Sequence, residues 1–196
     1  MYYPTRRRYP VPPSRSKPDV PCDLTSDMRK AWEQHVYWTR MVLISIAERL
    51  RDQSATTDRL LRNPKDIAEI FARYYGRESA EKVERLLTEH VQIGGALITA
   101  LRDGKGAQSE GLKRQWYANA DKMSEVFSRM NPHYGQSELR KMLYRHLDLT
   151  MQEVTMRLSH NYGADVQAFN TVEQEALMMA DYFSKGIAGQ FPGKVS

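Results

Sequence analysis

The fold is decided by residues 83–101, VERLLTEHVQIGGALITAL, in which apolar residues recur every three or four positions. At 100° per residue these apolar residues fall within one arc of a helix, and Glu84, Arg85 and Glu89 fall opposite them. His90 lies in the middle of the apolar arc. The segment therefore predicts an amphipathic helix, over residues 79–103, that buries a histidine in a helical core.

The same helical period continues along most of the chain from residue 25 onward. N-capping residues, Asn-Pro steps and glycines divide it into predicted helices over residues 25–53, 63–75, 79–103, 109–130, 137–161 and 164–188. No segment alternates at period two, and no internal repeat is evident. The short links after residues 103 and 130 make the helices on either side antiparallel neighbours.

These elements predict an all-α fold. We expect an up-and-down four-helix bundle formed by the helices that begin near residues 25, 79, 109 and 137. The segment 63–75 is predicted to be a short cross-helix, and 164–188 an additional C-terminal helix that packs alongside the bundle.

Residues 1–24 differ in composition from the rest of the chain. They contain six of the nine prolines, together with tyrosines and arginines, and almost no aliphatic residues. This composition predicts a disordered tail and leaves a helical bundle domain at residues 25–192. The tail is basic, which favours docking to an acidic surface; the alternative is a solvated extension without a specific partner.

The charge and hydropathy patterns exclude several classes of function. The tail carries a net charge of +3 and the other residues only +2, so the bundle offers no basic stripe for sequence-specific nucleic-acid binding. No run approaches the roughly 20 apolar residues of a membrane span, and no apolar segment follows the first arginines as in a signal peptide. These patterns favour a cytoplasmic protein.

Three histidines occupy the centres of apolar helix faces: His35, His90 and His146. Rises of about 1.5 Å per residue place His90, Asn119 and His146 within about one turn of a common level. Neutral imidazole is a good ligand for zinc, iron or copper, and helical bundles build metal sites at mid-height. The sequence predicts a metal site formed by these histidines and Glu153.

Four further polar residues lie on the same faces and are candidates for hydrogen bonding to the ligands or for binding a small molecule. They are Thr39, Asn119, Thr150 and Arg157. Two alternatives remain open: the polar residues form a closed internal hydrogen-bond network in a structural or interaction protein, or they bind a small organic acid with Arg157 as its counter-ion.

Catalysis has little support in the sequence. The only cysteine, Cys22, lies in the predicted tail, and neither a Gly-x-Ser-x-Gly motif nor a glycine-rich phosphate loop is present. One imidazole acting as a general base would make a small enzyme, but only the residue type favours this. The sequence therefore favours a non-catalytic metal-binding or ligand-binding bundle.

A series of short motifs resembles those of a known family. They include His35-Val-x-Trp-Thr-Arg, Leu60-Leu-Arg-Asn with Asp66-Ile, Tyr75-Gly, Leu86-Leu followed by His90, Trp116-Tyr-x-Asn-Ala-Asp, Asn131-Pro, Met142-Leu-Tyr-x-His-Leu with Thr150 and Glu153, and Phe191-Pro. Over residues 30–192 the chain is similar to small helical proteins of spore-forming Gram-positive bacteria. Members are sometimes labelled acetylglutamate kinase or glycosyltransferase, but both chemistries need α/β nucleotide-binding folds that this pattern lacks. The resemblance implies an all-α fold and a spore setting.

Overall fold

The computed structural model describes residues 24–194, which contain seven α-helices and a short 3-10 turn. They are α1 (Leu24–Ala47), α2 (Gln53–Leu60), α3 (Asn63–Tyr75), α4 (Arg77–Arg102), α5 (Gly106–Met130), α6 (Gln136–Leu158), α7 (Tyr162–Gln190) and η1 (Pro192–Lys194). The described residues form no strand, so the predicted all-α class is confirmed. The predicted tail lies outside the described residues except for Leu24. Across residues 24–194 no helix has the length and apolarity needed to cross a lipid bilayer.

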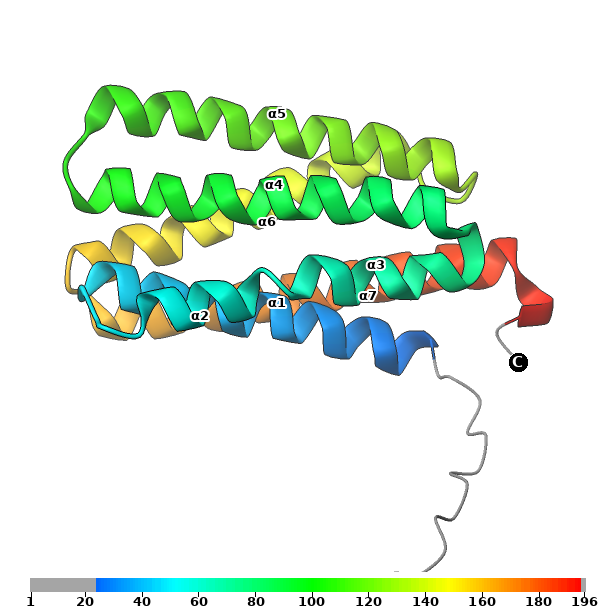
Figure 1. Ribbon diagram of the computed structural model, residues 1–196, viewed down its shortest axis with the longest axis horizontal. Coiled ribbons are helices and arrows are strands. Elements are labelled where there is room, and N and C mark those ends of the chain that lie inside the picture. The colour runs from blue at the N-terminus through cyan, green and yellow to red at the C-terminus, as the bar shows by residue number, and fades with distance from the viewer. Residues whose placement is uncertain (1–23, 195–196) are drawn as a thin grey trace, which may run out of the picture.

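The helices form three antiparallel hairpins that share one long axis (Figure 1). The first hairpin pairs α1 with α2 and α3, which lie end to end; the second pairs α4 with α5, and the third α6 with α7. Contacts of α3 with α4, α5 with α6, and α1 with α7 join the hairpins into a closed bundle. As a result α1, α4 and α6, the first helices of the three hairpins, run in the same direction (Figure 1).

The three hairpins are related in sequence. Their second helices align without gaps at a spacing of 56 residues, as LLRNPKDIAEIFAR (60–73), WYANADKMSEVFSR (116–129) and VEQEALMMADYFSK (172–185). Each segment carries a phenylalanine, a small residue and a basic residue in succession near its end. This internal repeat is a correction to the sequence analysis, which found none. Most aligned positions keep only the residue class and not the residue itself, so the repeat is not evident from identity.

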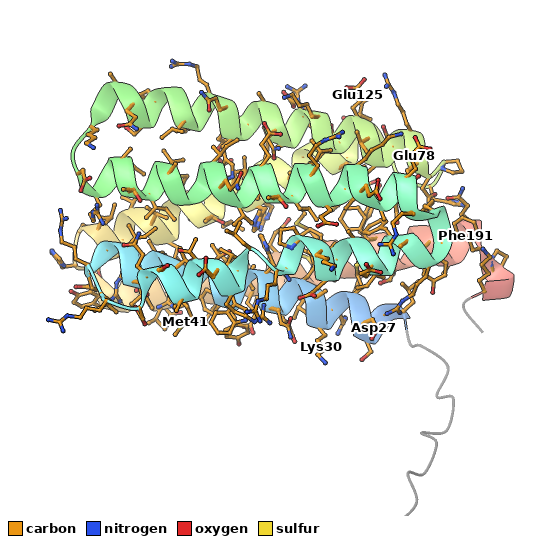
Figure 2. The ribbon with its side chains drawn as sticks, in the orientation of Figure 1. Asp27, Lys30, Met41, Glu78, Glu125 and Phe191 are labelled. Atoms are coloured by element: carbon orange, nitrogen blue, oxygen red, sulfur yellow. The ribbon has the colours of Figure 1, made fainter. Side chains whose placement is uncertain are left out.

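The repeat brings equivalent residues together in the core. Phe71, Phe127 and Phe183 contact one another, with ring centroids 4.7–5.7 Å apart, and each is at most 2% exposed. Aromatic rings at these distances stabilise a core beyond the area that they bury. Side chains fill the space between the ribbons, whereas Lys30, Met41 and Glu125 point outward (Figure 2). The phenylalanine cluster therefore holds the three hairpins against one another.

The structure differs from the sequence prediction at the end of the first helix. The helix predicted over residues 25–53 ends at Ala47, and a separate helix, α2, begins at Gln53. Arg49 adopts a φ of 52° between them, a left-handed conformation that ends a helix. No glycine or proline marks this point. Together α2 and α3 run along the bundle axis rather than across it (Figure 1), and α7 is a full member of the bundle through α1 and α6.

One glycine in α7 is required by packing. A Cβ atom added to Gly186 would lie 2.0 Å from Cε1 of Tyr134, whose ring is 2% exposed and whose hydroxyl donates to the carbonyl of Phe183 over 2.6 Å. We expect Gly186→Ala to lower the free energy of unfolding by about 1–3 kcal/mol, because the tyrosine has to move. Urea denaturation measures this change.

The control for this prediction is Gly111→Ala in α5. A Cβ at Gly111 meets nothing closer than the Arg114 side chain at 4.0 Å, so alanine is expected to stabilise the helix by up to about 1 kcal/mol. Equal stability changes at both glycines would contradict the packing argument.

Candidate metal centre

Three imidazoles meet inside the bundle, one from the first helix of each hairpin. His35 of α1, His90 of α4 and His146 of α6 are each 4% exposed. Their ring centroids lie 5.8–6.1 Å apart, in a nearly equilateral triangle, and one nitrogen of each ring lies within 4.8 Å of the others. The structure thus brings together the three histidines that helical periodicity had placed at the centres of three faces.

Two of the rings are oriented by asparagines from the second helix of their own hairpin. Nδ1 of His35 lies 3.0 Å from Oδ1 of Asn63, and Nδ1 of His90 lies 3.3 Å from Oδ1 of Asn119. The amide nitrogens of these asparagines donate to the backbone carbonyls of Ala31 and Leu86. Because a carbonyl only accepts, each asparagine presents its oxygen to the ring, and Nδ1 of the histidine donates. The Nε2 lone pairs of both rings are therefore left to bind a ligand.

The third histidine has no such partner. Among the described residues, Nδ1 of His146 is a buried nitrogen without a hydrogen-bond partner. Glu175 occupies the position that Asn63 and Asn119 hold in the other hairpins, but its carboxylate accepts from Nε of Arg145 over 2.8 Å. The described residues contain no hydrogen bond between two of the three imidazoles. In a closed internal hydrogen-bond network the ring nitrogens would all have partners within the protein. Because Nδ1 of His146 has none among the described residues, the arrangement favours a ligand bound between the rings.

The rings are neutral at physiological pH. Burial lowers the pKa of His35 from 6.5 to about 4 and the pKa of His146 to about 3. Burial and the two neighbouring histidines hold the pKa of His90 well below its usual range. Neutral imidazole is the form that binds a metal ion.

The spacing of the nitrogens suits a metal ion. Three atoms that lie within 4.8 Å of one another have a common point no farther than about 2.8 Å from each. Zinc–nitrogen bonds are about 2.0–2.1 Å long, so each ring would move inward by less than about 1 Å. Trp116 supports this geometry, because it stacks on His90 with centroids 5.1 Å apart and donates from Nε1 to the His90 carbonyl.

Two predicted site residues lie elsewhere. Glu153 is 2% exposed but accepts from Nη1 of Arg40 over 2.5 Å, and Arg40 also bonds Asp165. Arg157 pairs with Asp165 and with Glu48. Glu153 follows His146 by seven residues, which is about 10 Å along the helix. The structure therefore places Glu153 and Arg157 in a buried ionic network, and the candidate metal group consists of histidines alone.

An elongated cavity of about 380 Å³ opens onto the histidines. All three rings line it, and beyond them it follows α1 as far as Ile46 and α4 as far as Ala100. Its aliphatic lining consists of Val42, Ile46, Leu60, Leu61, Val91 and Ile98. The exposed side chains of Gln92, Lys105 and Gln108 also line it. Among the residues that the structure describes, no acidic one lines this cavity.

The other predicted polar residues lie beside the histidines. Thr39 and Thr150 line the cavity one helical turn beyond His35 and His146, and the Thr150 hydroxyl donates to the His146 carbonyl over 2.9 Å. The equivalent position in α4 is Gly94, which also lines the cavity. Asn63 is the functional residue that sequence reasoning missed, because an asparagine before a proline is typical of a helix start.

The chain matches no protein-family model, no curated protein and no solved structure.

Proposed function

We propose that this protein binds a divalent transition metal ion through His35, His90 and His146. The observation that carries the proposal is the meeting of three buried, neutral imidazoles from three hairpins, with no hydrogen bond between them among the described residues. The donor set of three imidazoles suits zinc, iron or copper. It leaves a coordination position open toward the cavity, as in sites that accept an exogenous ligand.

The test is elemental analysis by mass spectrometry of the untagged full chain prepared without chelators. We expect about one equivalent of metal per chain in the native protein and less than about 0.1 equivalent in the His90→Ala/His146→Ala variant. The control is His133→Ala/His160→Ala, which removes two exposed histidines and should keep the metal. Circular dichroism establishes that each variant is folded.

The result that would overturn the proposal is equally specific. If the native protein takes up no zinc, iron or copper after incubation, while the double variant is only less stable, the histidines form a structural network. The structural or interaction protein then becomes the better interpretation.

Asn63 and Asn119 give a second prediction, on affinity. Replacing either one with leucine is expected to weaken metal binding by about 10–100-fold, because a carboxamide that accepts from Nδ1 fixes the ring and raises its basicity. Competition with a chromogenic chelator measures the dissociation constant. The matched variant Asn170→Leu changes an exposed asparagine and should leave the affinity unchanged.

A further inference from the structure

The cavity above the histidines has two chemically distinct ends. At the inner end lie the three imidazoles with Thr39 and Thr150, and the rest of the wall combines aliphatic residues with polar ones such as Gln53 and Thr99. Five of its aliphatic residues belong to one of the two apolar clusters of the core. The aliphatic part of this wall favours an apolar group in the ligand. The shape therefore calls for a ligand with one polar end and one hydrocarbon end.

The charge at the inner end selects the polar group. Imidazole is a neutral ligand, so a divalent ion held by three of them keeps its full charge of +2, and no carboxylate among the described residues lines the cavity to offset it. A buried charge without compensation is costly, so the open coordination position favours an anion. Lys105 is the only charged side chain among the described residues of the lining, and it also favours anions.

The threonines add a specific contact for an anionic oxygen. Thr39 lines the cavity one turn from His35, where its hydroxyl can donate to the second oxygen of a carboxylate whose first oxygen binds the metal. Gly94 stands where the other two repeats have threonine, and the Trp116 ring lies 3.4 Å from where a Cβ would be, so Thr39 and Thr150 are the hydroxyls beside the rings. The head-group site therefore suits a planar, two-oxygen anion.

The length of the cavity indicates how long the hydrocarbon chain of the ligand is. From His90 to Ala100 the cavity follows about 15 Å of α4. Its volume of about 380 Å³ equals that of about a dozen liquid waters, which is large enough for an acid of about eight to ten carbons. A straight chain fits this elongated shape better than a compact ring does.

We infer that the protein binds a medium-chain monocarboxylate, with its carboxylate on the metal ion and its alkyl chain in the aliphatic chamber. This inference rests on the proposed function, because the metal supplies the charge that holds the head group. No bond is made or broken in the ligand. The protein then acts as a carrier or sensor of such acids.

The experiment uses the full chain loaded with Co²⁺, whose visible spectrum reports ligand exchange at the metal. Metal stoichiometry is measured first by elemental analysis, so that failure to bind metal is separated from failure to bind acid. Octanoate is expected to change the Co²⁺ spectrum and to bind about fourfold more tightly per added methylene across the series from butanoate to octanoate. Octan-1-ol, which lacks the anionic head, should leave the spectrum unchanged.

Two variants distinguish ligand binding in the chamber from binding of the metal ion. Gly95 lines the cavity, and a Cβ there meets nothing within 4 Å, so the larger side chain of Gly95→Leu has room to enter the chamber. It should keep one equivalent of metal and lose at least about tenfold in octanoate affinity. Gly111→Leu, in the open on α5, is the matched control and should bind octanoate as the native protein does.

Thr39→Val tests the head-group contact. It should weaken octanoate binding by about tenfold or more through loss of a hydrogen bond to a charged oxygen, with metal stoichiometry unchanged. The inference is overturned if metal binds but octanoate leaves the spectrum unchanged. It is also overturned if the affinity is independent of chain length, or if apoprotein binds octanoate as tightly as the Co²⁺ form.

Discussion

Zinc at a thousand times its dissociation constant is expected to raise the melting temperature of this protein by about 8–16 °C. An ion that binds only the folded chain stabilises it by about 4 kcal/mol at this ratio, and 1 kcal/mol corresponds to about 2–4 °C for a domain of this size. The unfolded chain competes poorly, because its three candidate ligands are far apart in sequence. Differential scanning calorimetry at several zinc concentrations measures the shift.

The same histidine variants serve as controls for this shift. His133→Ala/His160→Ala should keep the full increase, and His90→Ala/His146→Ala should shift by less than about 2 °C. An equal increase in melting temperature for His90→Ala/His146→Ala would show that zinc binds elsewhere and would overturn the proposal of a three-histidine site.

Removal of Arg40 is expected to have the largest effect on stability. Its guanidinium contacts the carboxylates of Glu153 and Asp165, which are 2% and 0% exposed. Arg40→Met leaves two buried carboxylates with less compensation, and such a loss costs about 3–5 kcal/mol. Urea denaturation at pH 8 measures the change. The control Arg62→Met removes an exposed arginine and should change stability by less than about 0.5 kcal/mol.

The effect of Arg40 depends on pH in a defined direction. Burial raises the pKa of Glu153 to about 7 from 4.5, although Arg40 opposes the rise. A carboxyl whose pKa is raised by folding contributes stability below pH 4.5 and loses it as the pH rises through 7, about 3 kcal/mol in all. Loss of Arg40 raises this pKa further.

Arg40→Met should therefore be least stable above pH 7 and recover toward pH 5. The double variant Arg40→Met/Glu153→Gln, which removes one of the two buried charges, should recover part of the stability at pH 8. A deficit that is independent of pH between 5 and 8 would contradict this account.

Helical periodicity identified the three histidines because a face of a helix is a property of local sequence. His35, His90 and His146 each stand among apolar residues on their own helix, and no long-range information is needed to see this. The rise per residue and the short loops between helices also predicted that His90 and His146 lie at the same height along the bundle axis. That is why the grouping of the three histidines could be predicted without the direction of α1.

Periodicity fails where depth along the axis matters. Glu153 shares a face with His146 but lies two turns away along α6. The face alone predicted that it joins the histidines, whereas its depth in the bundle places it beside Arg40. Asn63 was missed because its position before a proline is typical of a helix start. In the structure its side chain does not cap α3, but bonds the His35 ring and the Ala31 carbonyl. The break after Ala47 depends on a left-handed arginine, for which the sequence offers no signal.

The three imidazoles stand 55 and 56 positions apart along the chain. A bound ion would therefore close two long loops of chain. The chain loses the entropy of closing these loops before the three histidines can bind one ion. Capture of the ion must follow docking of the third hairpin, since a chain that stops after α5 has only two of the three nitrogens. During synthesis and refolding, metal content would then measure the fraction of molecules whose assembly is complete.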